Sequence, residues 1–348
     1  MTEKHVRTAL DEHGEKGEFK RVDAAWRSWI KKGDPEFPPE KDRYHLYISL
    51  ACPWANGCFC VLKMKGLEDT IGVSIVHPTW QKTNAGVDDH SGWAFKDPSD
   101  PPTANQNGHG SFECDGCIPD TINNAKYIRD LYRLADDKDG KYTVPVLWDK
   151  KKKTIVSNES TEILRMLNSE FNEFAKNPDL DLYPADLEIQ INAAHSWIYP
   201  NINNGVYRCG FAKTQEAYDA AADSLYENLC KAEKLLDRHR FVTGSRLTGI
   251  DLRLYMTLIR FDPVYVVYFK TSRKRISEFP NLFNFMKDIY QIPEVKAVTN
   301  LRHIKMHYFT SHPHLNFFAI IPKGSDEDVD LDAPHDRARL GKKRPLED

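Results

Sequence analysis

The segment from Tyr44 to Gly66, YHLYISLACPWANGCFCVLKMKG, constrains the fold of this chain more than any other stretch. Over residues 45–50 apolar side chains alternate with histidine, tyrosine and serine, which is the period of a strand buried on one face. Pro53 suits the first position of a helix, because its fixed φ fits there and its missing N–H would be unbonded anyway. Apolar residues then recur at helical spacing, and Gly66 ends the run. The sequence predicts a strand that leads directly into a helix.

Cys52 occupies the N-cap position of this predicted helix. A thiol there faces free backbone N–H groups and the positive end of the helix dipole, which favours the thiolate. The alternative is a structural cysteine, since free cysteines are among the most buried residues. A strand, a Cys-Pro pair and a helix in this order are typical of a thioredoxin-like redox or glutathione site. Packing alone hardly explains such a pair at the junction, so we predict a reactive thiol.

The composition is that of an ordinary protein of about two domains, given its 348 residues. Lys and Arg number 48 against 51 Asp and Glu, and the formal net charge of -3 gives no support for a nucleic acid or membrane partner. No apolar run approaches the roughly 20 residues that span a bilayer. The first residues also lack the apolar segment of a secretion signal, so we expect a cytoplasmic protein.

The seven cysteines are odd in number and do not suggest a secreted disulfide framework. Cys114 and Cys117, with two residues between them, could form half a metal site or a redox pair. They lie in a loop rich in Gly, Asp and Pro, and no second pair at zinc spacing accompanies them. We therefore predict no metal. Cys58 and Cys60 follow Cys52 in its helix, and we expect them to be inert core residues.

The order of elements over residues 41–170 is that of the thioredoxin fold, an α/β domain. A long loop rich in Gly, Pro, Asp and Asn, 78–119, separates its two halves. Asn158 is placed to cap the last helix, which begins SNESTEILRML. The remaining predicted elements are a strand over 71–77, a helix over 122–135, and a hairpin of strands over 143–148 and 154–157.

An all-α domain is predicted for residues 186–322, after a linker at 171–185. Thr248 and Asp251 form a capping box at the start of one of its helices. Residues 1–40 are expected to lie over the body as an N-terminal extension. The tail, 323–348, has few apolar residues and is expected to be disordered or a loosely docked arm. The predicted helices cover 186–199, 214–239, 249–260, 280–290 and 293–300.

Two further segments have the chemistry to complete a site around Cys52. Pro145 cannot donate a ladder bond, and in a thioredoxin fold it would be cis, leaving the backbone of Val144 free to pair with a peptide-like thiol ligand. The helix start at Glu159 and Ser160 offers N–H groups for a carboxylate and a side chain for an ammonium. An ordinary strand-start proline and an ordinary capped helix fit as well. With Cys52, the segments would hold the cysteinyl and γ-glutamyl parts of glutathione.

Tyrosines gather in three polar-aromatic clusters of the second half, around Tyr207, Tyr265 and Tyr308. A phenol can hydrogen-bond a thiolate or donate a proton to a leaving carbon. Each tyrosine taken alone is more often a packed residue with a satisfied hydroxyl.

Motifs spread over residues 44–315 resemble the glutathionyl-hydroquinone reductases, the xi class of glutathione transferases. The matching segments are SLACPWANGCFC, GWAF, TVPVLWD, NES, NNGVYRCGFA, HRFVTGSRLTGIDLRLY, RFDPVYVVYFK and HIKMHYF. The family nucleophile is the cysteine of CPWA, here Cys52. The resemblance implies that Tyr207 is the proton donor and that Tyr265 and Tyr308 stabilise the thiolate. It places the glutathione contacts at Trp93, Lys141, Val144, Glu159 and Ser160.

Two features depart from the family pattern. Lys141 stands where arginine is usual, so a bidentate carboxylate contact is not expected there. The loop over 97–119, with its cysteine pair, matches the family poorly. The resemblance also implies a homodimer, by analogy with transferases of this fold.

The implied reaction is the glutathione-dependent reduction of S-glutathionyl hydroquinones, with glutathione as co-substrate and no bound cofactor. Position 55 is alanine, so Cys52 has no CxxC partner and a second glutathione must resolve it. One alternative is an omega-like thiol transferase that reduces dehydroascorbate or mixed disulfides. Another is a glutathione-fold binding protein without turnover.

Overall fold

The computed structural model describes residues 6–324 and 329–341. Contacts divide the chain into two compact units, each built from segments that are distant in sequence. The first unit contains residues 6–11, 23–178 and 300–322, and the second contains 12–22, 179–299 and the described part of the tail.

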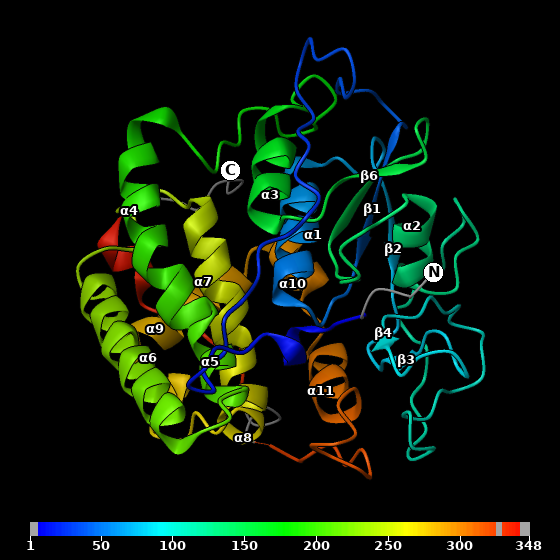
Figure 1. Cartoon of the computed structure of the whole chain (residues 1–348). Helices are drawn as coiled ribbons and strands as arrows, with labels where there is room; N and C mark the ends of the chain where they lie inside the picture. The colour runs from blue at the N-terminus through cyan, green and yellow to red at the C-terminus, as the bar shows by residue number, and fades with distance from the viewer. Residues whose placement is uncertain (1–5, 325–328, 342–348) are drawn as a thin grey trace. The chain divides into compact units, whose positions relative to one another are not determined.

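A four-stranded sheet in the order β2-β1-β5-β6 is the centre of the first unit (Figure 1). Strand β1 pairs in parallel with β2 and antiparallel with β5, which forms the predicted hairpin with β6. Helices α1 and α3 pack together on one side of the sheet and α2 lies on the other, which confirms the thioredoxin-like fold (Figure 1). The bounds are β1 Tyr44–Ile48, α1 Pro53–Lys65, β2 Gly72–Ile75, α2 Ile128–Leu134, β5 Val146–Asp149, β6 Thr154–Ser157 and α3 Ser160–Ser169.

The strand-to-helix junction forms as predicted, but all five residues of β1 are buried, so this strand is covered on both faces and not on one. Cys52 is the N-cap of α1, with an extended backbone at φ -73° and ψ 119°, and Pro53 follows at the first helical position. Gly66 ends the helix in the left-handed conformation at φ 65°, and its N–H bonds to the carbonyls of Leu62 and Lys63. A residue without Cβ adopts this conformation at little cost, which is why the helix stops there.

The predicted helix over 122–135 is wrong in its first half, because α2 begins only at Ile128. The carboxylate of Asp120 accepts hydrogen bonds from the backbone N–H groups of Ile122, Asn123 and Ala125 and from the Tyr47 hydroxyl. The bonds from residues 122 and 123 are those of a helix N-cap, but Asn124 adopts the left-handed conformation at φ 53°, so no helix continues from Asp120.

The cap of α3 also differs from the prediction. Glu159, not Asn158, is the N-cap, and its side chain accepts from the Thr161 N–H at 2.9 Å. The Asn158 amide donates to the Tyr132 hydroxyl at 2.8 Å, and its oxygen accepts from the Trp26 N–H at 3.1 Å. Because these partners come from distant segments, local capping preference could not identify them.

Part of the N-terminal extension runs along the outer edge of β6. The Ser28 N–H donates to Val156 O at 3.0 Å, and the Asn158 N–H donates to Trp26 O at 3.0 Å. Ile30 is fully buried. The extension thus occupies the backbone groups of an edge strand that would otherwise be open to pairing with another chain.

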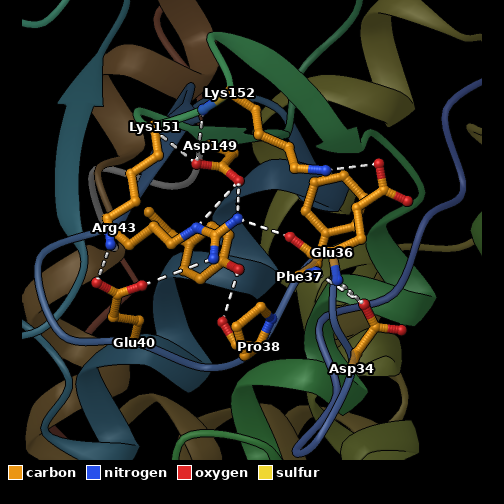
Figure 2. Close-up of polar contacts among 10 residues, drawn as sticks. Asp34, Glu36, Phe37, Pro38, Glu40, Arg43, Asp149, Lys151 and Lys152 are labelled. Atoms are coloured by element: carbon orange, nitrogen blue, oxygen red, sulfur yellow. Dashed lines mark hydrogen bonds and ion pairs between the residues drawn. The ribbon is translucent and has the colours of Figure 1, made fainter.

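Residues 34–40 of the extension are joined to the start of β1 and the β5–β6 turn by a polar network (Figure 2). The Arg43 guanidinium binds the fully buried Asp149 carboxylate at 2.5 Å and donates to Glu36 O at 2.7 Å. The Asp149 side chain also accepts from the Lys151 N–H at 2.8 Å. Removing one partner of such a buried, hydrogen-bonded pair leaves an uncompensated charge, so the network stabilises both the extension and the hairpin.

The second unit is helical, as predicted, and its π-helical segments are η3 Tyr199–Asn203 and η4 Phe261–Tyr265. The predicted capping box forms, with the Thr248 N–H donating to Asp251 at 2.8 Å. Within the described ranges, no helix has the length and apolar character needed to cross a membrane. The α-helices of the second unit are α4 Glu188–Ile198, α5 Gly205–Gly210, α6 Gln215–Leu236, α7 Gly249–Arg260, α8 Val266–Tyr268, α9 Pro280–Tyr290 and α10 Pro293–Val298.

The observed division differs from the predicted boundaries in two places. Helix α11, Leu301–Thr310, belongs to the first unit, because it packs on the loop segment 77–80 and on 113–116. Residues 12–22 of the extension belong to the second unit, where Phe19 packs on Phe211 with ring centroids 5.5 Å apart.

The described part of the tail is docked on the second unit. Arg337 is fully buried, and its guanidinium donates to Arg240 O at 3.1 Å. The Gln291 amide donates to the carbonyls of Leu331 and Ala333 at 3.0 Å each. A few anchoring residues therefore dock an otherwise polar arm.

Candidate functional site

The Cys52 thiol lies beside the carbonyl of Val144. The sulfur is 3.8 Å from Val144 O, to which it donates, although the residues are 92 positions apart in the chain. The Val144–Pro145 peptide bond is cis, as predicted. Cys52 is 9% exposed and Val144 5% exposed. The first unit therefore brings together the thiol and the backbone segment that were predicted to share one ligand.

The start of α3 is linked to the helix that begins after Cys52. The Cys58 Sγ in α1 lies 3.4 Å from Trp54 O of its own helix and 3.6 Å from Ser160 O, so a buried cysteine contacts the first residue of α3. Ser160 is 5% exposed. The Glu159 carboxylate is occupied by its capping bond with the Thr161 N–H. This bond uses Oε1, so a ligand ammonium could bind the other oxygen of the same carboxylate.

Trp93 follows the short strand β4, Ser91–Gly92, which pairs with β3, Gln81–Lys82. Its indole stacks on the imidazole of His307 in α11, with centroids 4.4 Å apart and planes 24° apart. Tyr308, the next residue of α11, is 2% exposed. Thus Tyr308 lies in the same unit as Cys52 and Trp93, and sequence order had grouped it with the helical domain.

Lys141 lies in the irregular segment between α2 and β5, three residues before Val144, and is 8% exposed. The preceding carbonyl, Gly140 O, accepts from the Arg7 N–H at 3.1 Å. The N-terminal segment therefore anchors the stretch that carries Lys141.

Tyr207 and Tyr265 lie together in the second unit, with ring centroids 6.1 Å apart. Tyr265 is fully buried and stacks on Phe269 at 5.1 Å, while Tyr207 is 8% exposed. The Arg21 guanidinium lies 5.0 Å from the centre of the Tyr207 ring and donates to Asn204 Oδ1 at 2.7 Å. Sequence reasoning missed Arg21, because nothing in a polar N-terminal extension marks one arginine as the neighbour of a tyrosine far along the chain.

Cys114 and Cys117 are free and buried, at 1% and 2% exposure. Burial raises the pKa of the Cys114 thiol. It also raises the pKa of the Cys117 thiol, to about 12. Among the residues that the structure describes, no group of three His, Cys, Asp or Glu side chains is arranged to hold a metal ion. The pair therefore has the character of packed thiols, which are poor nucleophiles.

Two protein-family models match the chain, one in the β-sheet unit and the other in the helical unit. The N-terminal domain of glutathione S-transferases matches residues 51–170, and the C-terminal domain matches residues 215–288. The first match contains the Cys52 junction, the hairpin and α3.

Several known proteins are similar in sequence to this chain over most of its length. Glutathionyl-hydroquinone reductase YqjG of Escherichia coli is 44% identical, covering 92% of each chain. Glutathionyl-hydroquinone reductase PcpF of Sphingobium chlorophenolicum is 39% identical, covering 88% of this chain and 90% of its own. The glutathione S-transferase omega-like 2 of Schizosaccharomyces pombe is 38% identical, covering 95% and 99%.

Solved structures agree with these matches. The xi glutathione S-transferase of Phanerochaete chrysosporium superposes with a TM-score of 0.80 at 43% identity, covering 91% of this chain and 100% of its own. The glutathione-bound structure of YqjG superposes with a TM-score of 0.79 at 43% identity, covering 90% and 96%. These findings confirm the resemblance inferred from the motifs. The chain belongs to the glutathione transferase family, in its xi class together with the glutathionyl-hydroquinone reductases.

Proposed function

We propose that this protein reduces S-glutathionyl hydroquinones to hydroquinones at the expense of glutathione. One observation carries the proposal: a cysteine at the N-terminus of α1 lies 3.8 Å from the carbonyl of Val144, in a chain 44% identical to a glutathionyl-hydroquinone reductase. A helix N-terminus favours a thiolate, and a backbone carbonyl beside it suits a peptide-like thiol ligand.

In the first step the Cys52 thiolate attacks the sulfur of the glutathionyl hydroquinone. A Cys52–glutathione disulfide forms and the carbon–sulfur bond breaks, so the ring carbon leaves with the electron pair and takes up a proton from Tyr207. A second glutathione thiolate then attacks the mixed disulfide, which releases oxidised glutathione and the Cys52 thiolate. The proton given up by that second glutathione restores Tyr207. One hydroquinone is released for each two glutathione units oxidised.

The remaining residues have supporting roles in the proposal. Tyr265 and Tyr308 stabilise the Cys52 thiolate by hydrogen bonding or through their polar rings. Glutathione is held by the Val144 backbone and by the N-terminal end of α3. Its full set of contacts is Trp93, Lys141, Val144, Glu159 and Ser160.

A second candidate function is that of an omega-like thiol transferase, acting on dehydroascorbate or mixed disulfides. The observation in its favour is the 38% identity to the omega-like 2 transferase of Schizosaccharomyces pombe. Both functions use Cys52 as a monothiol, but only the first needs a proton donor for carbon.

Comparing substrates on the purified protein separates the two functions. We expect turnover of glutathionyl-menadione to exceed that of hydroxyethyl disulfide and dehydroascorbate. The Cys52→Ala variant should retain below about 0.1% of the wild-type turnover of glutathionyl-menadione. Tyr207→Phe should lower hydroquinone release by about 100-fold and disulfide reduction by less than about threefold. Tyr290→Phe is the matched control outside the site and should leave both rates unchanged. Turnover by Cys52→Ala, or equal losses on both substrates in Tyr207→Phe, would contradict the mechanism.

Two broader properties belong to the same proposal. We place the protein in the cytoplasm, because its seven cysteines are odd in number and their spacing does not suggest a secreted disulfide framework. A homodimer follows by analogy with transferases of this fold. Sedimentation should then give about twice the chain mass of 40.1 kDa, and a value near 40.1 kDa would refute the dimer.

A further inference from the structure

Trp93 lies in a region with little regular structure. Strand β4, just before it, has two residues, and the loop segments on either side are long. Its backbone is tied down, since Trp93 O accepts from the Ile128 N–H at 3.0 Å and the neighbouring Phe95 N–H donates to Lys126 O at 2.8 Å. These bonds locate the main chain but leave the indole plane undetermined. Contacts of the ring itself must therefore set its orientation.

The ring beside it, His307, is held rigidly. Its Nδ1 lies 2.8 Å from Pro78 O and 3.0 Å from Ser311 Oγ. Because a carbonyl oxygen only accepts, Nδ1 must carry the hydrogen, which determines both the tautomer and the ring plane. Ser311 Oγ also donates to Pro78 O at 3.0 Å, so the end of α11 is joined to the Pro78 backbone twice. His307 is 6% exposed.

The rings of Trp93 and His307 meet face to face, whereas the ring of Trp80 meets Trp93 edge to face. His307 stacks on Trp93 at 4.4 Å and 24°, and Trp80 approaches Trp93 at 5.6 Å and 84°. Trp80 is half-buried and lines a pocket of about 620 Å³, so its own ring is not enclosed on all sides. Of these two neighbouring rings, the imidazole of His307 is the one that lies flat against the face of the Trp93 indole.

We infer that His307 is a positioning residue of the glutathione site, holding the Trp93 indole in the orientation that binds glutathione. The inference rests on the proposed function, which makes Trp93 a glutathione contact. His307 also precedes Tyr308 in α11, and their ring centroids are 5.1 Å apart. The same helical turn thus supports Trp93 and carries a proposed thiolate-stabilising tyrosine.

Two substitutions separate ring stacking from structural support. His307→Phe keeps an aromatic face against Trp93 but loses the hydrogen bond to Pro78 O. His307→Asn keeps an amide donor near the Nδ1 position but loses the ring. If His307 only stabilised α11, glutathione affinity would follow the melting temperature across both variants. If it positions Trp93, the two measurements separate.

Calorimetric titration of reduced glutathione into the purified proteins gives the dissociation constant. His307→Asn removes the stacked ring, so we expect the dissociation constant of glutathione to rise about tenfold. His307→Phe keeps an aromatic ring, so we expect a rise of less than about threefold. The KM for glutathione should rise in parallel while kcat changes by less than about threefold. His303→Asn is the matched control: His303 is buried in α11 one turn earlier, and its ring contacts Asp115 O at 2.6 Å. It should lower the melting temperature without changing the affinity.

Each result decides the matter. Wild-type affinity in a folded His307→Asn variant would overturn the positioning role, as would equal losses of affinity in both His307 variants or a loss in His303→Asn that matches them. Failure of the unsubstituted protein to bind glutathione would instead overturn the proposed function, and the inference with it.

Discussion

Two buried cysteines of the first unit have different backbone surroundings, and we expect them to differ in reactivity. Cys52 ends an extended segment as the N-cap residue of α1, and its sulfur lies 3.8 Å from Val144 O. Cys117 closes a tight turn, in which its N–H bonds to Cys114 O at 3.0 Å, and it is 2% exposed. Burial, with smaller effects from the neighbouring Cys114 and Asp115, raises the pKa of Cys117 to about 12. At neutral pH this thiol is almost entirely protonated.

Alkylation of the native protein tests this contrast. With iodoacetamide at pH 7.5 we expect Cys52 and the exposed Cys230 to be modified at least about 100-fold faster than Cys117, because only the thiolate reacts. The rate at Cys117 should rise about tenfold for each pH unit while the fold persists. Peptide mass spectrometry follows each site separately. Modification of Cys117 at the rate of Cys52 would contradict this account.

At the scale of single elements, short polar side chains decide where helices begin. Asp120 and Asp251 are both acidic residues near a predicted helix start. Asp251 reaches back to the Thr248 N–H and hydroxyl at 2.8 Å each, so α7 starts where the sequence predicts. Asp120 accepts from the N–H groups of residues 122, 123 and 125, but Asn124 adopts the left-handed conformation at φ 53°, so α2 starts late. A capping carboxylate therefore starts a helix only where the residues after it keep a helical backbone.

Asp251 also makes the stability of α7 depend on pH. The residue is fully buried, and burial raises the pKa of its carboxyl to about 6 from a usual 3.8. The folded state then holds the proton more tightly than the unfolded state, so this contribution is complete below about pH 4 and is lost as pH rises through 6. The Asp251→Asn variant should have a lower free energy of unfolding than the wild type, and we expect this difference to be largest near pH 4. At pH 7 the difference should be smaller by up to about 3 kcal/mol.

Urea unfolding of the wild type and Asp251→Asn across pH 4 to 7 measures this difference directly. Comparing the two proteins at each pH cancels the titration of all other groups. A deficit that stays constant over this range, or that grows as pH rises, would show that the hydrogen bonds to Asp251 outweigh its burial.

At the scale of the whole molecule, the N-terminal extension contributes packing to both units. Ile30 is fully buried in the first unit, and its N–H donates to the Met166 sulfur at 3.1 Å. Phe19 is 3% exposed in the second unit, where it packs on Phe211. One polar segment therefore supplies core residues to two separate hydrophobic cores.

Substitutions at these two residues should act on different units. We expect Ile30→Ala and Phe19→Ala each to cost about 2–5 kcal/mol, because each removes buried apolar volume. Hydrogen exchange of the native protein resolves where the loss occurs. Protection should fall in the β-sheet unit for Ile30→Ala and in the helical unit for Phe19→Ala. Uniform loss of protection in both variants would mean that the two units unfold together.

Much of the fold and part of the site could be predicted, and the successes share a cause. Alternating apolar residues predicted β1, Pro53 and Gly66 predicted the bounds of α1, and Thr248 with Asp251 predicted the start of α7. In each case the decisive forces act within a few residues of chain. The expected proximity of Cys52 and Val144 depended on recognising the thioredoxin-like order of elements, and the structure places them 3.8 Å apart.

The sequence by itself determined that a thiol stands at a strand-to-helix junction with no second cysteine at CxxC spacing. Only the tertiary structure decided that α11 joins the first unit, that His307 lies flat on Trp93, and that Arg21 covers Tyr207. These contacts join segments far apart along the chain. Burial of apolar surface and stacking of rings stabilise these contacts once the folded backbone has brought the segments together. A local pattern of residues cannot predict them, because it contains no information on which distant segments meet.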